Sequence, residues 1–137
     1  WQKKVNAIKQ GIVLNKADKN DPIGALAAVG GYEIAGMAGI ILAAAANKIP
    51  VMLDGFISAT AAVIAAGLAP DAKDYMIAGH ESEEQGHKHL LDLLGLKPLL
   101  RLNMRLGEGT GAVCALPLAE IAAATITEIA TFDEAGI

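Results

Sequence analysis

The sequence predicts an α/β domain in which short parallel strands alternate with helices. Segments 50–54 (PVMLD) and 74–78 (DYMIA) are short, continuous apolar runs followed by glycine, which is typical of buried parallel strands. A third extended segment is expected at 99–106. Helical patterns lie before, between and after these runs, and such alternation favours βαβ units with right-handed crossovers. The length of 137 residues fits one α/β domain over 1–137.

Apolar spacing and capping residues predict the helices. Asp21 and Pro22 have the residue types of an N-cap and a first helical turn, and Gly95 closes a later, polar-faced helix. In the final helix Pro117 is expected in an early turn and Cys114 as a small core residue. The alanine- and glycine-rich helices have faces that admit close neighbours. The expected helices span 1–15, 22–29, 33–47, 57–67, 83–94 and 111–132.

Composition and charge narrow the function classes. Hydrophobic residues make up 53% of the chain and charged residues 19%, which excludes a disordered polypeptide. The net charge of −4 argues against a nucleic-acid partner. The single cysteine, Cys114, cannot form an internal disulfide, so we expect a reducing, cytoplasmic compartment. The apolar runs at 34–46 and 57–69 fall short of the ~20 residues of a membrane-spanning helix, and no secretory signal opens the chain, so no membrane association is expected.

Each expected strand is followed by a segment that combines glycine with a polar side chain. The three segments read Asp54-Gly55-Phe56, Gly79-His80-Glu81-Ser82 and Gly107-Glu108-Gly109-Thr110-Gly111. Ligands of open α/β sheets bind beyond the carboxyl ends of the strands. The three segments together therefore predict one binding site.

The glycine-rich segment 105–111 (RLGEGTG) has two interpretations. Alternate glycines free backbone N–H groups to face an anion, and Glu108 stands alone between Gly107 and Gly109. A carboxylate would repel a phosphate, which favours a general base beside a glycine-lined ligand site. The same residues also fit a glycine-rich turn in which Glu108 favours the start of the next helix through the helix dipole.

The other polar candidates also have alternatives. His80 and Ser82, in the loop expected after the second strand, are candidates for binding substrate oxygens, whereas Ser82 could equally cap the helix expected from Glu83. Asp54 fits either a ribose hydroxyl or the cap of the helix expected near Ile57.

Two further patterns have weaker signals. Gly30 and Gly31 could let a phosphate approach a helix N-terminus or only let helices pack closely. Glu84 and His87 have the Glu-x-x-His spacing of carboxylate-bridged metal sites, but the sequence holds no second such pair, so no metal is expected. Lys4 by itself is typical of a solvated helix face.

Four longer motifs in order make the chain recognisable: DPIGALAAVGGYEIAGMAGIILAAA, PVMLDGFISATAA, AGHESEEQGH and MRLGEGTGAVCALPLAEIAAA. With them the chain closely resembles, over nearly its whole length, the C-terminal part of the nicotinate-nucleotide:dimethylbenzimidazole phosphoribosyltransferase family, enzymes of cobalamin lower-ligand assembly. The resemblance implies a Rossmann-like parallel sheet flanked by Ala/Gly-rich helices.

The resemblance also implies a reaction and roles for site residues. In the family a benzimidazole nitrogen attacks the ribose anomeric carbon of nicotinate mononucleotide; nicotinate leaves, the configuration inverts and α-ribazole phosphate forms, with no cofactor or metal. Glu108 matches the catalytic base, Leu106 a position lining the aromatic base pocket, and Lys4, in WQKKV, a functional lysine. The region that holds the nucleotide is matched by Gly30, Gly31 and Ser82.

One departure from the family concerns length. Family members are roughly twice as long or more, beyond the ~100–150 residues of a typical domain. The N-terminal lobe and the GEMGIGNTT-type segment with its essential acid have no counterpart here, and the chain opens at Trp1 without an initiator Met. We therefore expect a fragment that is inactive alone and whose full-length parent is a homodimer.

Overall fold

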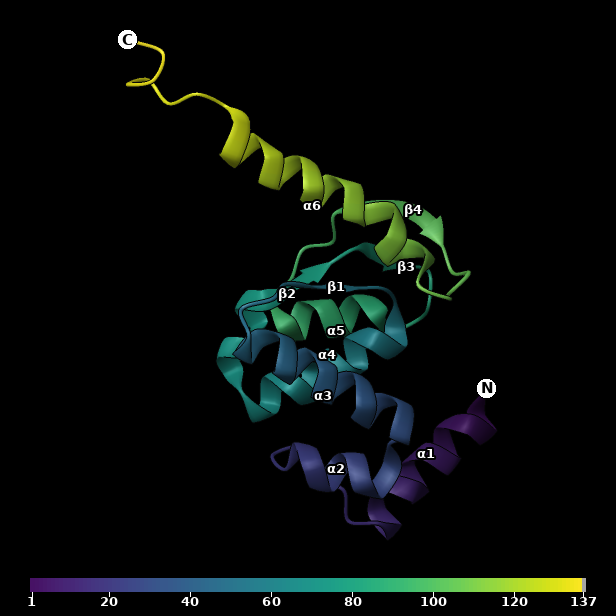
Figure 1. The fold of residues 1–137 in the computed structure, drawn as a ribbon. Coiled ribbons are helices and arrows are strands. Elements are labelled where there is room, and N and C mark those ends of the chain that lie inside the picture. The colour runs from purple at the N-terminus through teal and green to yellow at the C-terminus, as the bar shows by residue number, and fades with distance from the viewer. Residues whose placement is uncertain (137) are drawn as a thin grey trace.

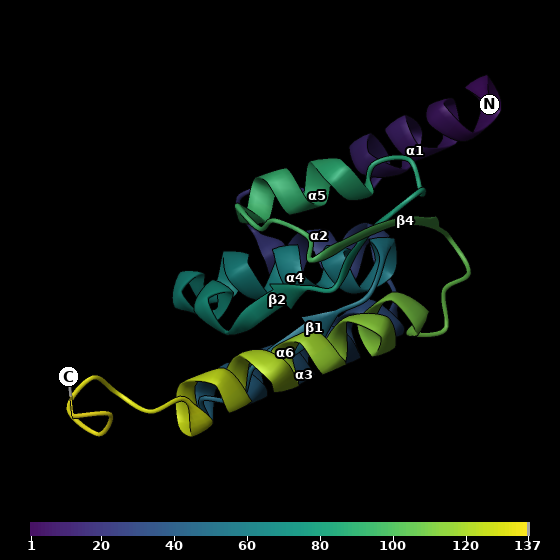
Figure 2. The same ribbon diagram turned by 90° about the horizontal axis from the view of Figure 1, so that it is seen from above.

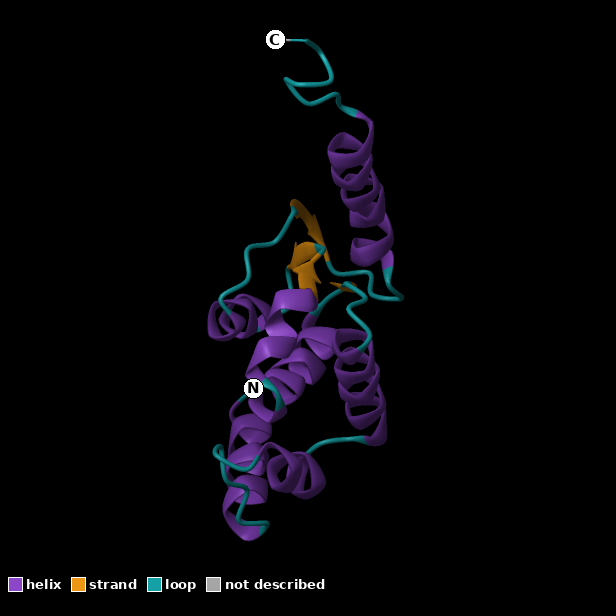
Figure 3. Ribbon diagram, turned by 60° about the vertical axis from the view of Figure 1, so that its left-hand side comes forward, coloured by secondary structure: helices purple, strands orange, loops and turns teal. Residues whose placement is uncertain are grey.

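The fold was analysed in a computed structural model that describes residues 1–136. The elements follow in the order α1 (Gln2–Leu14), α2 (Pro22–Val29), α3 (Tyr32–Ala46), β1 (Val51–Leu53), α4 (Phe56–Leu68), the 3-10 helix η1 (Pro70–Tyr75), β2 (Met76–Ala78), β3 (His80–Ser82), α5 (His87–Leu94), β4 (Leu100–Met104) and α6 (Thr110–Glu128). The strands lie between α3, α4 and α5 on one side and α6 on the other (Figures 1 and 3). This arrangement confirms the α/β fold class.

The parallel strands meet at Gly79. β1 pairs with β2, with Leu53 opposite Ala78, and β3 pairs with β4, with His80 opposite Leu100. The Gly79 N–H donates to the Leu53 carbonyl at 2.9 Å, and the Leu100 N–H donates to the Gly79 carbonyl at 3.1 Å. The segment 76–82 is therefore one extended stretch that pairs with β1 through its first half and with β4 through its second half.

Three expectations around this stretch are wrong. The second strand begins at Met76 rather than at residue 74, because the preceding residues form η1. His80 to Ser82 form strand β3 rather than a loop, since the ladder with β4 continues as far as Glu83, whose N–H donates to the Met104 carbonyl at 3.0 Å. The next helix therefore starts at His87 and not at residue 83, after a turn that ends at the left-handed Gly86.

The remaining helices lie close to their expected positions. The Asp21 carboxylate accepts the Gly24 N–H at 2.9 Å and caps α2, as its residue type predicts.

Helix α6 ends at Glu128 rather than at residue 132, and Pro117 lies inside the helix, beyond its first turn. Cys114 is exposed, so its prediction as a core residue is wrong. The reason is that α6 buries little besides Gly111 and Ala115.

Alanine-rich helices build the core. α4 buries four alanines and packs against α3 on one face and α5 on another. Because alanine has no side chain beyond Cβ, these helices approach each other and the sheet closely. The central cluster consists of Ala38, Ile41, Leu53, Ala61, Ala62, Ala65, Ala72, Met76 and Leu94.

Helix α6 is long, apolar and largely exposed, and it buries Gly111 and Ala115. Viewed from above, the chain segment after α6 and the start of α1 project from opposite ends of the molecule (Figure 2). By length and composition α6 meets the criterion for a membrane-crossing helix, a criterion that core helices of soluble proteins also meet. From the sequence, only uninterrupted apolar runs were considered as possible membrane spans. This helix was therefore not considered, because Glu120 and several threonines interrupt its apolar residues.

Gly79 gives the first prediction. A Cβ on Gly79 would lie 2.8 Å from the Leu53 carbonyl oxygen and 3.1 Å from the Ala112 Cα, and these backbone atoms cannot turn aside. We expect Gly79→Ala to lower the free energy of unfolding by about 1–3 kcal/mol in urea titrations followed by circular dichroism.

Gly36→Ala in α3 is the matched control. A Cβ there meets nothing within 4 Å, so we expect it to raise the free energy of unfolding by about 0.5–1 kcal/mol through helix propensity. Equal effects of the two substitutions would contradict the close approach at Gly79.

Candidate active site

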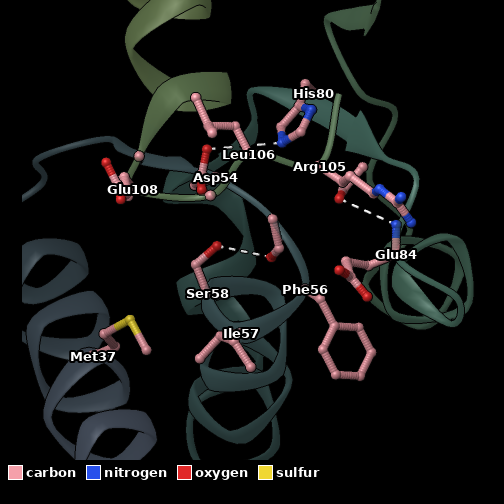
Figure 4. Close-up of a pocket in the computed structure, with 14 residues that line it drawn as sticks. Met37, Asp54, Phe56, Ile57, Ser58, His80, Glu84, Arg105, Leu106 and Glu108 are labelled. Atoms are coloured by element: carbon pink, nitrogen blue, oxygen red, sulfur yellow. Dashed lines mark hydrogen bonds and ion pairs between the residues drawn. The ribbon is translucent and has the colours of Figure 1, made fainter. Parts of the chain in front are cut away.

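A cleft of about 590 Å³ opens beyond the carboxyl ends of the strands. Its walls come from the segment after β1, from the end of β3 and the following turn, from the loop between β4 and α6, and from Met37 of α3 (Figure 4). The structure thus places the three glycine-containing segments around one cavity. The sequence-predicted residues that line it are Asp54, His80, Ser82, Leu106, Gly107, Glu108 and Gly109.

Glu108 lies in a left-handed stretch of backbone. Gly107, Glu108 and Gly109 have φ values of +83°, +56° and +79°. Glycine adopts this conformation readily, whereas a residue with a side chain does so at a cost of about 1 kcal/mol or more. Glu108 is exposed, and although α6 begins directly after Gly109, the Glu108 side chain accepts no hydrogen bond from the first turn of α6; the N-cap Gly109 has no side chain to offer. The carboxylate therefore borders the cleft without being used as a cap.

Asp54 caps a helix other than the expected one. Its Oδ1 accepts the N–H of Ala112, in the first turn of α6, at 3.1 Å. The N-cap of α4 is instead Gly55, with no side-chain hydrogen bond. A carboxylate at the α6 N-terminus is stabilised by the helix dipole. The same Oδ1 lies 3.7 Å from His80 Nε2, so Asp54 joins the end of β1, β3 and α6 at one wall of the cleft.

His80 and Ser82 are both buried at the cleft wall, with 4% and 8% of their surfaces exposed. A Cβ on Gly111 would overlap the His80 ring, so only glycine at the start of α6 lets that helix close over the histidine. The Ser82 hydroxyl accepts the Glu84 N–H at 3.2 Å and its backbone N–H donates to His87 Nδ1 at 2.9 Å. Ser82 therefore holds the turn before α5 and does not cap a helix beginning at residue 83.

His87 is buried and neutral near pH 7. Burial is the main cause that lowers its pKa, the neighbouring His80 lowers it further, and Glu81 and Asp54 partly oppose the shift. Glu84 lies in the turn and not on α5, so the helical premise of the Glu-x-x-His pattern is wrong. Within residues 1–136 no three His, Cys, Asp or Glu side chains are grouped as a metal site.

Three sequence-predicted residues lie away from the cleft. Gly30 and Gly31 border a separate pocket of about 490 Å³ between α2 and α3, together with the exposed Tyr32. A Cβ on Gly30 would come within 2.5 Å of the Leu26 carbonyl oxygen one turn earlier in the same helix, so this glycine meets a local requirement at the end of α2. Lys4 is exposed on α1 and does not line the cleft.

Several lining residues were not predicted from the sequence. Arg105, part of the quoted RLGEGTG motif, contributes a permanent positive charge at the end of the cleft opposite Glu108 (Figure 4). Phe56 follows the Asp54-Gly55 pair directly and Ser58 lies two residues further on, so their position after a strand was an available signal. Met37 reaches the cleft from α3, and no local pattern in the sequence marks it.

Known proteins that are similar in sequence and in structure are phosphoribosyltransferases. A family model described as phosphoribosyltransferase matches residues 1–137. The chain is 55% identical over 136 residues to the nicotinate-nucleotide–dimethylbenzimidazole phosphoribosyltransferase of Desulforamulus reducens and 56% identical over 135 residues to that of Desulforudis audaxviator. The crystal structure of the corresponding Thermus thermophilus protein covers 85% of this chain with a TM-score of 0.78 and 49% identity.

The matches cover only part of the relatives. The aligned region is 99% of this chain but 39% of the Desulforamulus reducens protein, and it is 35% of the Thermus thermophilus chain. The chain therefore spans about two fifths of the length of the curated relatives that it matches.

The buried His87 predicts a pH-dependent stability. The unfolded chain binds a proton at His87 near the ordinary pKa of 6.5, whereas the folded chain, with its lowered pKa, does not. Since the unfolded state binds more protons, the free energy of unfolding should fall as the pH drops below about 6.5, by at most about 1.4 kcal/mol per pH unit from this group.

Urea titrations at a series of pH values across this window would measure the slope. His87→Asn, which does not titrate, should flatten it, whereas His89→Asn at the neighbouring exposed histidine should leave it in place. A slope that survives His87→Asn would assign the effect to another group.

Proposed function

This chain belongs to the phosphoribosyltransferase family, and on that premise we propose that it forms part of the active site of a transfer of the phosphoribosyl group from nicotinate mononucleotide to 5,6-dimethylbenzimidazole. The products are nicotinate and α-ribazole 5′-phosphate, and the step belongs to cobalamin biosynthesis. The observation that carries the proposal is Glu108, an exposed carboxylate fixed at the rim of the cleft between two left-handed glycines.

Glu108 is proposed as the catalytic base. As one azole nitrogen attacks the anomeric carbon of the ribose, the new C–N bond forms while the bond to nicotinate breaks. The electron pair of the breaking bond goes to the nicotinate ring nitrogen, which loses its positive charge. The azolium would then hold a positive charge, so removal of the proton on its other nitrogen by Glu108 lowers the energy of the transition state. Attack opposite the leaving group inverts the anomeric configuration.

The walls of the cleft suit the two substrates differently. Leu106 is 73% exposed at the rim and, with Phe56 and Met37, offers apolar surface to an aromatic base. Arg105 offers a positive charge to an anionic nucleotide. Asp54 and Ser82 are proposed to face the ribose hydroxyls, with His80 serving the substrate through its contact with Asp54. Gly107 and Gly109 leave room for the substrate beside Glu108.

Lys4, Gly30 and Gly31 are proposed to help bind the nucleotide on the family resemblance alone. They lie on α1 and between α2 and α3, away from this cleft. The proposed chemistry needs no metal or other cofactor, because proton removal and the loss of charge on nicotinate drive the transfer.

An exchange experiment tests the role of Glu108. The matching segment of the Desulforamulus reducens protein is replaced by this chain, whose 55% identity favours a working chimera. We expect Glu108→Gln to lower kcat by about 10²–10⁴-fold, because Gln cannot accept the azole proton, while KM for nicotinate mononucleotide stays nearly unchanged. Production of α-ribazole 5′-phosphate is measured by liquid chromatography and mass spectrometry.

Two comparisons complete this experiment. Glu120→Gln, at an exposed glutamate of α6 outside the cleft, should leave kcat unchanged. The 137-residue chain alone should form no product, because the resemblance assigns an essential acid to a segment that this sequence lacks. Turnover that survives Glu108→Gln would contradict the assigned base.

A non-catalytic nucleotide- or azole-binding module is the second candidate. It is supported by a cleft that opens within a chain spanning 39% of its relative. A chimera that binds nicotinate mononucleotide in calorimetry but forms no product would favour this module over the transferase.

We further propose that the full-length protein is a cytoplasmic homodimer that acts on small molecules and not on nucleic acid. The net charge of −4 supports the exclusion of nucleic acid, and the apolar surface of α6 supports packing against another part of the protein rather than a membrane. The exposed large apolar residues of α6 are Val113, Leu116, Leu118, Ile121 and Ile126.

The proposed assembly can be measured on the same chimera. We expect light scattering coupled to gel filtration to give twice the mass of one chain, because exposed apolar surface of this extent is normally covered in an assembled protein. The mass of a single chain at micromolar concentration would contradict the dimer.

A further inference from the structure

Two buried histidines, His80 in the cleft wall and His87 behind it, lie near each other. Their ring centroids are 6.1 Å apart and their planes are inclined by 47°. We propose that the two rings form one hydrogen-bonded chain that links the Ser82 backbone to the Asp54 carboxylate and holds these two walls of the cleft in position. His80 and His87 are thus positioning residues, and their effect on transfer, though not their hydrogen bonding, rests on the proposed function.

The hydrogen bond from Ser82 fixes the proton on His87. Because His87 Nδ1 accepts the Ser82 N–H at 2.9 Å, the neutral ring must hold its proton on Nε2. His87 is fully buried, so this Nε2–H needs an acceptor inside the protein.

The position of Asp54 favours a proton on His80 Nε2, through a contact that is longer than the hydrogen bond at His87. His80 Nε2 lies 3.7 Å from Asp54 Oδ1, so a proton on Nε2 faces a carboxylate. Nδ1 of the neutral ring is then an acceptor that needs a donor. Asp54 in turn accepts the Ala112 N–H at 3.1 Å, which extends the chain to the first turn of α6.

The two remaining ring nitrogens complement each other. Among residues 1–136 neither His80 Nδ1 nor His87 Nε2 has a hydrogen-bond partner, and both are buried. The contact of His80 Nε2 with Asp54 leaves His80 Nδ1 as an acceptor, and the hydrogen bond from Ser82 to His87 Nδ1 leaves His87 Nε2 as a donor. With the ring centroids 6.1 Å apart the two nitrogens are too far from each other for a direct hydrogen bond, whereas one bridging water molecule would satisfy both buried groups.

The proposed chain requires that both rings stay neutral. A proton on His87 Nδ1 would remove the acceptor for Ser82, and a proton on His80 Nδ1 would set two donors against each other. The charged and titratable groups that face His87 are His80 and Glu81 of β3 and Asp54 after β1. Burial and His80 lower the pKa of His87 and thus favour the neutral ring, while the two carboxylates oppose this effect.

Nitrogen-15 NMR of the 137-residue chain tests the proposal without any substitution. Long-range proton–nitrogen spectra of the imidazole rings distinguish the two neutral tautomers and the charged form. At about pH 7.5 we expect His80 and His87 both as the Nε2–H tautomer, with the exposed His89 as the internal reference. A charged His80, or a proton on Nδ1 of either ring, would overturn the proposed chain.

Substitution of His87 tests the connection across the cleft wall. The Asn carbonyl of His87→Asn occupies the place of Nδ1 and can still accept the Ser82 N–H, but the shorter side chain cannot reach His80. We expect the Ser82 amide signal to stay close to its wild-type position, while the His80 ring and the Ala112 amide shift. His89→Asn should shift neither.

An unchanged His80 ring and Ala112 amide in His87→Asn would show that His87 serves only as a local acceptor for Ser82, and this result would overturn the proposal. These readouts do not depend on turnover, so they separate the failure of the hydrogen-bonded chain from a failure of the proposed transferase activity.

Discussion

The backbone pairing of segment 76–82 is the constraint on which the rest of the structure depends. This segment pairs with β1 before Gly79 and with β4 after it, so it connects the two halves of the sheet. The ends of all the strands that border the cleft are placed by this pairing, and Gly79 leaves room for both the Leu53 carbonyl and α6. Without the pairing of segment 76–82, nothing would hold the segments that carry Asp54, Ser82 and Glu108 in fixed positions relative to one another.

The sequence predicted the fold class and most helices because their signals are local. Asp21 caps α2, and Gly95 ends α5, through contacts within a few residues. The extent of β3 depends instead on pairing with β4, some twenty residues further along the chain, and no local pattern shows that Glu83 continues this ladder. For the same reason Asp54 could be read as a capping residue, but its partner Ala112 on α6 could not be identified.

The candidate site was predictable to a similar degree. Glycine next to a polar residue after a strand is a visible pattern, and it identified three of the cleft's walls. Met37 escaped because a methionine within an apolar helix looks the same whether it faces a core or a cavity. The burial of His80 also depends on Gly111, which brings α6 close over the ring.

The left-handed backbone at Glu108 has a consequence for evolution and engineering. Glycine at this position would adopt the left-handed backbone without strain, so the glutamate carries a cost of about 1 kcal/mol that stability alone would select against. Selection for thermal stability without selection for activity should therefore remove this side chain early. An unfavourable backbone conformation at a residue in a binding cleft therefore indicates that the position serves the chemistry of the site more than the stability of the fold.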